Sequence, residues 1–211
     1  MVNPTNKTKV FGVGFHKTGT STLNDVLQIL GYRVCGNKNV LAKDLLNNDL
    51  SRLDSFFEEY DAFQDNPWPL LYKEFYQKYP ESKFILTTRD EDKWWNSLLN
   101  HFGSEHTPMR QWIYGNGVPE GNEPLYRERY RQHNKEVIDF FSDKPEQLLV
   151  IDWKENDSKW ERICEFLEKP VPQSNFPHAN KKAYTKLGRA WQEIKLFYYR
   201  TFIKPKRSQT L

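Results

Sequence analysis

The stretch KVFGVGFHKTGTST, residues 9–22, decides the fold. Its first part, Lys9 to Gly14, is a short apolar run with β-branched and aromatic residues, which is typical of a buried strand. A polar turn with glycines follows directly. Apolar residues then recur with helical spacing before Gly31, at Leu23, Val26, Leu27 and Leu30. The sequence therefore predicts a strand, a tight loop and a helix in succession, an arrangement that favours anion binding because backbone N–H groups converge where the helix begins.

The rest of the chain alternates in the same way between apolar runs and amphipathic stretches. Strands are expected at 32–35, 60–64, 83–88 and 148–152. Helices are expected at 40–46, 50–57, 67–79, 90–99, 126–141, 160–167 and 184–202. The segment 103–124 is rich in Gly and Pro, and we expect a long excursion with room for one helical turn, of the kind that often covers a site.

This alternation predicts the fold class. Apolar strands that alternate with helices are typical of an α/β fold, with a central parallel sheet flanked by helices on both faces. The length of 211 residues fits a single P-loop-type domain over residues 1–211. Within it we expect a core at about 9–180, a C-terminal helix at 184–202 and a basic tail at 203–211.

Composition and charge exclude several classes of protein. The mean hydropathy is −0.84 and no apolar run approaches the ~20 residues of a membrane span, so we expect no transmembrane segment. A net charge of +3 is too small to indicate a nucleic-acid partner. The first residues lack the apolar segment of a signal peptide, and two cysteines cannot form a disulfide framework, so we expect a cytoplasmic protein. Nothing in the composition indicates an oligomeric state.

The loop GFHKTGTS, Gly14 to Ser21, has the two glycines of a Walker A motif at the correct separation. However, Thr20 stands where that motif has its lysine, and Lys17 lies inside the loop, which disfavours ordinary ATP or GTP binding. A dinucleotide fingerprint fails too, because Lys17 occupies the third glycine position. Two interpretations stay open: a site for phosphate or sulfate, or a turn that only connects strand to helix.

Two motifs resemble those of the sulfotransferases. The first motif, residues 17–22, is similar to the family's 5'-phosphosulfate loop. It consists of Lys17, Thr18, Gly19, Thr20, Ser21 and Thr22. Arg89 and Ser97, eight residues apart, fit the family's 3'-phosphate motif, and the stretch KFILTTRDEDKWWNS around them is similar throughout. Later segments, including LLVIDWKENDSKWERICEFLEKPVP and FPHAN, resemble small bacterial-type members. The resemblance spans about residues 9–180.

The resemblance implies which donor the protein uses and which residues bind it. The donor is 3'-phosphoadenosine 5'-phosphosulfate (PAPS), with adenosine 3',5'-bisphosphate (PAP) as product and no metal. Lys17 is then the group that stabilises the leaving oxygen, and it binds the donor together with Thr18, Gly19, Thr20, Ser21 and Thr22. Arg89 and Ser97 hold the 3'-phosphate. The sequence has no motif with metal-ligand spacing.

The acceptor hydroxyl needs a base, and Asp65 is the candidate. In the stretch Gln64-Asp65-Asn66-Pro67, Asp65 takes the position at which cytosolic members of the family have a catalytic histidine. A carboxylate is compatible with this chemistry, since other branches use Glu. The alternative is that Asp65 caps the helix expected to begin at Pro67.

The acceptor itself is expected to be a small molecule or a carbohydrate, and the group that receives the sulfonate is a hydroxyl or, as the second choice, an amine. Trp112 and Tyr114 in the excursion, with Trp68 and Phe102, either stack on it or pack beneath a lid. Two other functions are weighed against sulfotransfer. One is a nucleotide or nucleoside kinase with a diverged P-loop, and the other is a PAPS-binding or nucleotide-binding module without catalysis.

Overall fold

The computed structural model of the chain describes residues 8–154 and 158–177. Within them, five strands form a parallel sheet in the order β2-β3-β1-β4-β5. The strands are β1 (Val10–Gly12), β2 (Val34–Cys35), β3 (Ala62–Phe63), β4 (Lys83–Thr88) and β5 (Leu148–Asp152). The α/β class with a central parallel sheet, predicted from the alternation of apolar runs and helices, is confirmed.

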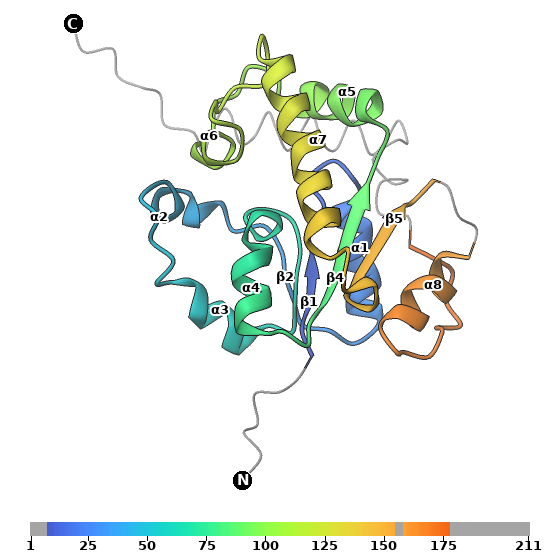
Figure 1. The fold of residues 1–211 in the computed structure, drawn as a ribbon. Helices are drawn as coiled ribbons and strands as arrows, with labels where there is room; N and C mark the ends of the chain where they lie inside the picture. The colour runs from blue at the N-terminus through green and yellow to red at the C-terminus, as the bar shows by residue number, and fades with distance from the viewer. Residues whose placement is uncertain (1–7, 155–157, 178–211) are drawn as a thin grey trace, which may run out of the picture. The chain divides into compact units, whose positions relative to one another are not determined.

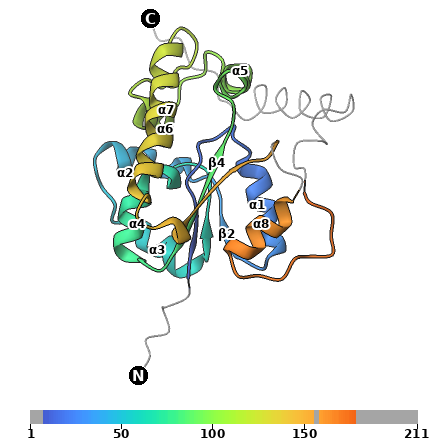
Figure 2. The ribbon, with the colours of Figure 1, turned by 45° about the vertical axis from the view of Figure 1, so that its right-hand side comes forward.

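Helices cover both faces of this sheet. Figure 2 shows α1 (Thr20–Ile29) and α8 (Lys159–Phe166) on one face, and α3 (Leu53–Glu59), α4 (Tyr72–Lys78) and α7 (Glu123–Phe140) on the other. The remaining helices are α2 (Ala42–Leu46), α5 (Glu91–Phe102) and α6 (Pro108–Tyr114), with short 3-10 turns η1 (Asn39–Leu41), η2 (Trp68–Leu71) and η3 (Pro145–Gln147). No helix in the described part of the chain combines the length and the apolar character needed to cross a membrane.

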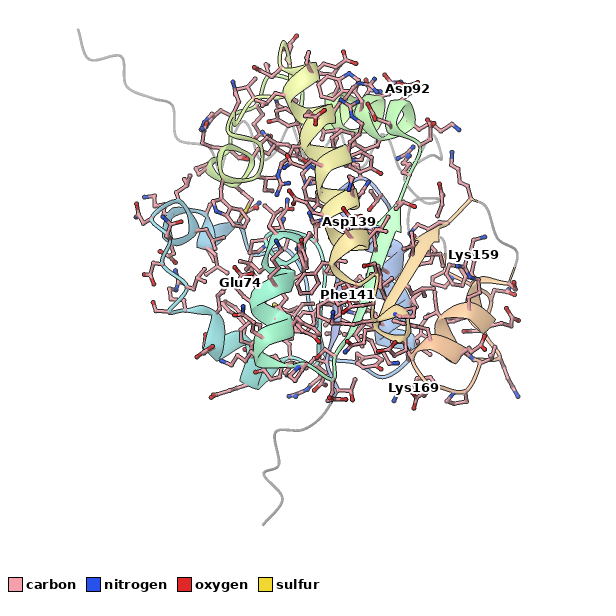
Figure 3. The ribbon with its side chains drawn as sticks, viewed as in Figure 1. Glu74, Asp92, Asp139, Phe141, Lys159 and Lys169 are labelled. Carbon is pink, nitrogen blue, oxygen red and sulfur yellow. The ribbon has the colours of Figure 1, made fainter. Side chains whose placement is uncertain are left out.

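The core has two layers because strand side chains alternate between the faces of the sheet. On the α4 and α7 side, the Phe11 ring lies 5.2 Å from that of Phe63 and 5.4 Å from that of Phe84. Phe75 of α4 stacks on Phe11 at 4.3 Å, and Phe141, labelled in Figure 3, packs 4.6 Å from Phe84. In the opposite layer the strand side chains are aliphatic, with Val10, Ala62 and Ile85 under α1 and α8. Much of the aromatic excess in the composition is therefore used for core packing, where each buried ring contributes about 1.5–3 kcal/mol.

Several predicted boundaries agree closely with the structure. β4 and β5 have the predicted bounds, and the Asp90 carboxylate caps α5 by accepting a hydrogen bond from the Lys93 amide at 3.0 Å. The excursion 103–124 differs from the expectation, because α6 extends over seven residues. It begins at a Thr107 cap, and the Thr107 hydroxyl accepts from the Arg110 amide at 3.2 Å. The predicted helix 184–202 and the basic tail 203–211 lie outside the described residues.

Candidate active site

The candidate site residues follow the ends of different strands. Because the strands are parallel, their carboxyl ends meet at one edge of the sheet. Lys17 follows β1, Asp65 follows β3 and Arg89 follows β4, while Ser97 lies on the next helix, α5. Figure 1 shows α5 and α6 beyond this edge of the sheet. The fold thus brings residues that are far apart in sequence to one edge.

The loop after β1 is shaped by Thr18. Its amide and its hydroxyl both donate to the Phe15 main-chain oxygen, at 3.3 and 2.6 Å. Since the Thr18 hydroxyl is committed as a donor there, it accepts from the Thr87 hydroxyl, 2.6 Å away on β4. Both threonines are buried. The amide and the hydroxyl of Thr18 therefore stabilise the loop itself, and contacts with a ligand are left to the residues next to it.

Helix α1 begins at this loop with open amides. Gly19 is its N-cap, with φ 103°, and no side chain caps the helix. The Thr22 amide is bonded to the Gly19 oxygen at 2.9 Å, whereas the Thr20 and Ser21 amides have no hydrogen-bond partner among residues 8–154 and 158–177. Unpaired amides at the positive end of a ten-residue helix form a ready anion site.

Lys17 lies in a mixed electrostatic environment. Its side chain is half-buried, and the Nζ atom is 6.0 Å from the centre of the Phe102 ring. Burial lowers the pKa of Lys17 below its ordinary value and the charge of Arg89 lowers it further, while the charge of Asp65 acts in the opposite direction. The charges of Arg89 and Asp65 therefore act on the Lys17 ammonium in opposite directions.

Asp65 lies in the loop that follows β3. Its φ is 66°, and its Oδ1 accepts a hydrogen bond from the Asn66 amide at 2.8 Å. Burial raises the pKa of Asp65, and that hydrogen bond and the Lys17 charge only partly offset the increase. The interpretation of Asp65 as a helix cap is wrong, because η2 begins after Pro67 without any side-chain cap bond. The contact from the Trp68 amide, at 3.1 Å, goes to the main-chain oxygen of Asp65.

The main chain of Arg89 is fixed by two hydrogen bonds, and part of its guanidinium stays available to a ligand. The Tyr130 hydroxyl accepts from the Arg89 amide at 3.0 Å and donates to the Arg89 oxygen at 2.8 Å. Arg89 Nη1 donates to the Lys17 oxygen at 3.1 Å, whereas Nε is buried and has no partner among the described residues. A buried donor without a partner is costly, so this guanidinium is suited to an anion. Ser97 is half-buried on α5.

Sequence reasoning missed two contributors to this edge. Tyr130 lay in the expected apolar stripe of a helix, and its hydroxyl instead fixes the main chain of Arg89. Trp153, directly after β5, packs its indole against Gly19, and its Nε1 is buried with no partner in the described part of the chain. The only available signal for Trp153 was its place at the end of the strand LLVID. Within the described residues, no group of three or more His, Cys, Asp or Glu side chains is placed to hold a metal ion.

Two comparisons with known proteins indicate what the chain is similar to. A family model described as a sulfotransferase domain matches residues 9–119 and 105–185. Over 151 residues the chain is 30% identical to Ava biosynthesis cluster protein M of Aspergillus versicolor, a match that covers 59% of this chain and 56% of that protein. The chain therefore spans little more than half the length of this curated relative.

Proposed function

The chain belongs to the sulfotransferase domain family, and from this premise we propose that it transfers a sulfonate group from PAPS to a hydroxyl of a small-molecule or carbohydrate acceptor. The observation that carries the proposal is the position of Lys17. Lys17 lies in the loop next to the N-terminal end of α1, and the charges of Arg89 and Asp65 both act on its ammonium, in opposite directions. In this proposal Lys17 is the cation for the leaving group, and Asp65 is the carboxylate for the acceptor.

The donor would be held by separate groups at its two ends. The amides of Thr20 and Ser21 and the Lys17 ammonium would bind the 5'-phosphosulfate, since all are donors near the positive end of α1. The Nε of Arg89, which has no partner in the part of the chain that the structure describes, would bind the 3'-phosphate together with the Ser97 hydroxyl. Gly19, Thr18 and Thr22 would contribute by shaping the loop and the first turn of the helix.

The transfer is an in-line displacement at sulfur. The acceptor oxygen forms a new S–O bond as the bond from sulfur to the bridging oxygen of the 5'-phosphate breaks, which leaves PAP. Negative charge develops on that bridging oxygen, where Lys17 and the α1 amides stabilise it. Asp65 takes the proton from the acceptor hydroxyl, and its raised pKa makes it a better base than an ordinary exposed aspartate.

The first experiment separates this function from its two rivals. We expect purified protein to bind PAP in calorimetry and to transfer label from sulfur-labelled PAPS to members of a panel of phenols, sugars, alcohols and amines. Transfer should persist in EDTA, whereas a diverged nucleotide kinase would need magnesium and ATP. A module without catalysis would bind PAP and transfer nothing to any acceptor.

Substitution of the loop lysine then tests the site itself. Lys17→Met keeps much of the volume and removes the charge, so we expect turnover to fall by about 100-fold or more, the scale of losing one oxyanion-stabilising group. Lys43→Met, at an exposed position on α2, is the matched control and should behave like wild type. Equal turnover of the two variants would remove Lys17 from the proposed role.

A further inference from the structure

Three buried polar side chains join the segments that surround the proposed site. His16 directly precedes Lys17, Asn66 directly follows Asp65, and Tyr114 is the last residue of α6. Their exposed fractions are 4%, 6% and 3%. Buried polar groups of this kind must find partners within the protein, and these three find one another.

The imidazole of His16 is at the centre of this cluster. Its Nδ1 lies 3.0 Å from Asn66 Nδ2 and 3.3 Å from Asn66 Oδ1, and its Nε2 lies 2.9 Å from the Tyr114 hydroxyl. Two tautomers satisfy these contacts: either Asn66 Nδ2 donates to Nδ1 and Nε2–H donates to the Tyr114 oxygen, or Nδ1–H donates to Asn66 Oδ1 and the Tyr114 hydroxyl donates to Nε2. The main chain of His16 is fixed as well, because its oxygen accepts from Trp94 Nε1 at 3.1 Å.

His16 does not have the properties of a general acid or base. Both ring nitrogens are engaged inside the protein. Burial lowers the pKa of His16 to about 3; the hydrogen bond with Asn66 opposes this decrease, and the nearby charges of Arg110, Lys17 and His101 add to it. The ring is therefore neutral at physiological pH, and both of its nitrogens are occupied by contacts within the protein. Its contacts are those of a structural connection between the loop, the Asp65 segment and α6.

We propose that His16 is a positioning residue, which sets the distance between Lys17 and Asp65 and connects both to α6 through Asn66 and Tyr114. This inference rests on the proposed function, because Lys17 and Asp65 are its leaving-group stabiliser and its base. The connection to Asp65 is short. The side chain of Asn66 contacts His16, and the main-chain N–H of Asn66 donates to Asp65 Oδ1 at 2.8 Å. A displaced Asn66 would therefore move and weaken the hydrogen bond to the base.

The two stacked tyrosines next to this cluster provide a matched pair of variants. Tyr114 and Tyr126 stack with ring centres 3.9 Å apart, and both are buried. The Tyr114 hydroxyl contacts His16, whereas the Tyr126 hydroxyl donates to the Asn116 oxygen at 2.7 Å. Tyr114→Phe and Tyr126→Phe each remove one buried hydroxyl and keep the stacked ring. Only the first breaks the cluster.

The kinetic test compares these two variants. We expect Tyr114→Phe to lower kcat by about 10- to 100-fold, the effect of misplacing reacting groups by a fraction of an ångström to 1 Å, with the Kd for PAP unchanged. Tyr126→Phe should keep the wild-type kcat, although both variants melt at a lower temperature. Equal kcat values for the two variants, or a loss of PAP binding in Tyr114→Phe alone, would overturn the positioning role.

A second readout does not depend on turnover. In the free protein, the pKa of Asp65 followed by carbon-13 NMR should rise further in His16→Leu, because a weaker hydrogen bond from Asn66 stabilises the ionised form less. His16→Asn returns a polar atom toward Asn66 and should recover part of the wild-type value. If Leu and Asn variants titrate like wild type, the inference is wrong. Failure of the proposed function appears differently, as a wild-type protein that neither binds PAP nor transfers sulfonate.

Discussion

Arg89 Nη1 donates a hydrogen bond to the main-chain oxygen of Lys17 at 3.1 Å, although the two residues are 72 positions apart. The bond connects the end of β4 to the loop after β1. It also leaves Nε of the same guanidinium buried without a partner among the described residues. The hydrogen bond thus fixes one side of the guanidinium to the loop, and a buried donor without a partner is the kind of group that favours an anion.

The first prediction concerns the selectivity that Arg89 confers. Arg89→Lys keeps the charge and loses the planar fork, so it should bind PAP about 10- to 100-fold more weakly, the loss expected for one or two charge-assisted hydrogen bonds. Affinity for adenosine 5'-monophosphate, which has no 3'-phosphate, should change much less. Calorimetry with both nucleotides measures the ratio. If the two affinities fall together, Arg89 acts by holding the loop through the Lys17 oxygen and does not bind the 3'-phosphate.

The second prediction is a bell-shaped dependence of kcat/KM on pH. Asp65 must be ionised to act as base, so activity should rise with pH through its pKa, which burial holds above the ordinary value of about 3.9. Lys17 must be protonated, so activity should fall at alkaline pH through a pKa that burial and Arg89 hold below about 10.4. Initial rates in constant-ionic-strength buffers give both limbs.

Two variants assign these limbs to residues. Lys17→Arg keeps a cation that does not deprotonate in the accessible range, so the alkaline limb should move upward or disappear. Asp65→Asn should lose most activity at every pH and show no acid limb in what is left. An unchanged alkaline limb in Lys17→Arg would assign that limb to another group.

The third prediction is that the proposed base lowers the stability of the folded protein at neutral pH. A carboxyl with a raised pKa in the folded state favours the protonated form, so its contribution is present below the unfolded pKa and is lost as pH rises through the folded value. Asp65→Asn should therefore raise the melting temperature at pH 7 and leave it nearly unchanged at pH 3. Thermal melts of both proteins at the two pH values test this. A lower melting temperature for Asp65→Asn at pH 7 would contradict it.

The sequence was sufficient to predict the sheet and the residues at its edge, because both depend on local patterns. Strand β4 is a run of buried apolar residues that ends in Arg89, and parallel strands place such ends together. The Asp90 cap was predicted from a single side chain at the start of a helix, and it formed as expected. Predictions of this kind need no knowledge of how distant segments pack.

The contributions that were missed depend on long-range packing. Thr18 belongs to the predicted anion loop, but its hydroxyl is committed to Phe15 and Thr87, and Thr87 is 69 positions away. His16 contacts Tyr114 from a helix 98 positions later, in a segment expected to be mostly loop. No period or motif in one sequence indicates which buried polar groups will meet. Their partners follow only from the placement of α6 and the Asp65 segment.

The last prediction concerns Gly19, which must satisfy two constraints at once. Its φ of 103° disfavours any side chain, and a Cβ there would lie 2.3 and 2.4 Å from Cδ1 and Nε1 of the Trp153 indole. Gly115, at the end of α6, has φ 76° and nothing within 4 Å of a Cβ, so it isolates the backbone cost. Gly115→Ala should cost about 1–2 kcal/mol of unfolding free energy in urea melts. Gly19→Ala should cost more, by about 1–3 kcal/mol of overpacking.

Removing the indole separates the two constraints at Gly19. In a Trp153→Ala background, Gly19→Ala should cost only as much as Gly115→Ala does in the wild type, because the clash is gone and the backbone strain stays. The difference between the single and double variants is then a coupling energy between Gly19 and Trp153. PAP binding should weaken in Gly19→Ala even where the protein is folded, since the α1 amides next to it are displaced. A Gly19→Ala protein as stable as Gly115→Ala, with its full affinity for PAP, would show that the loop can move away from Trp153 without losing its geometry.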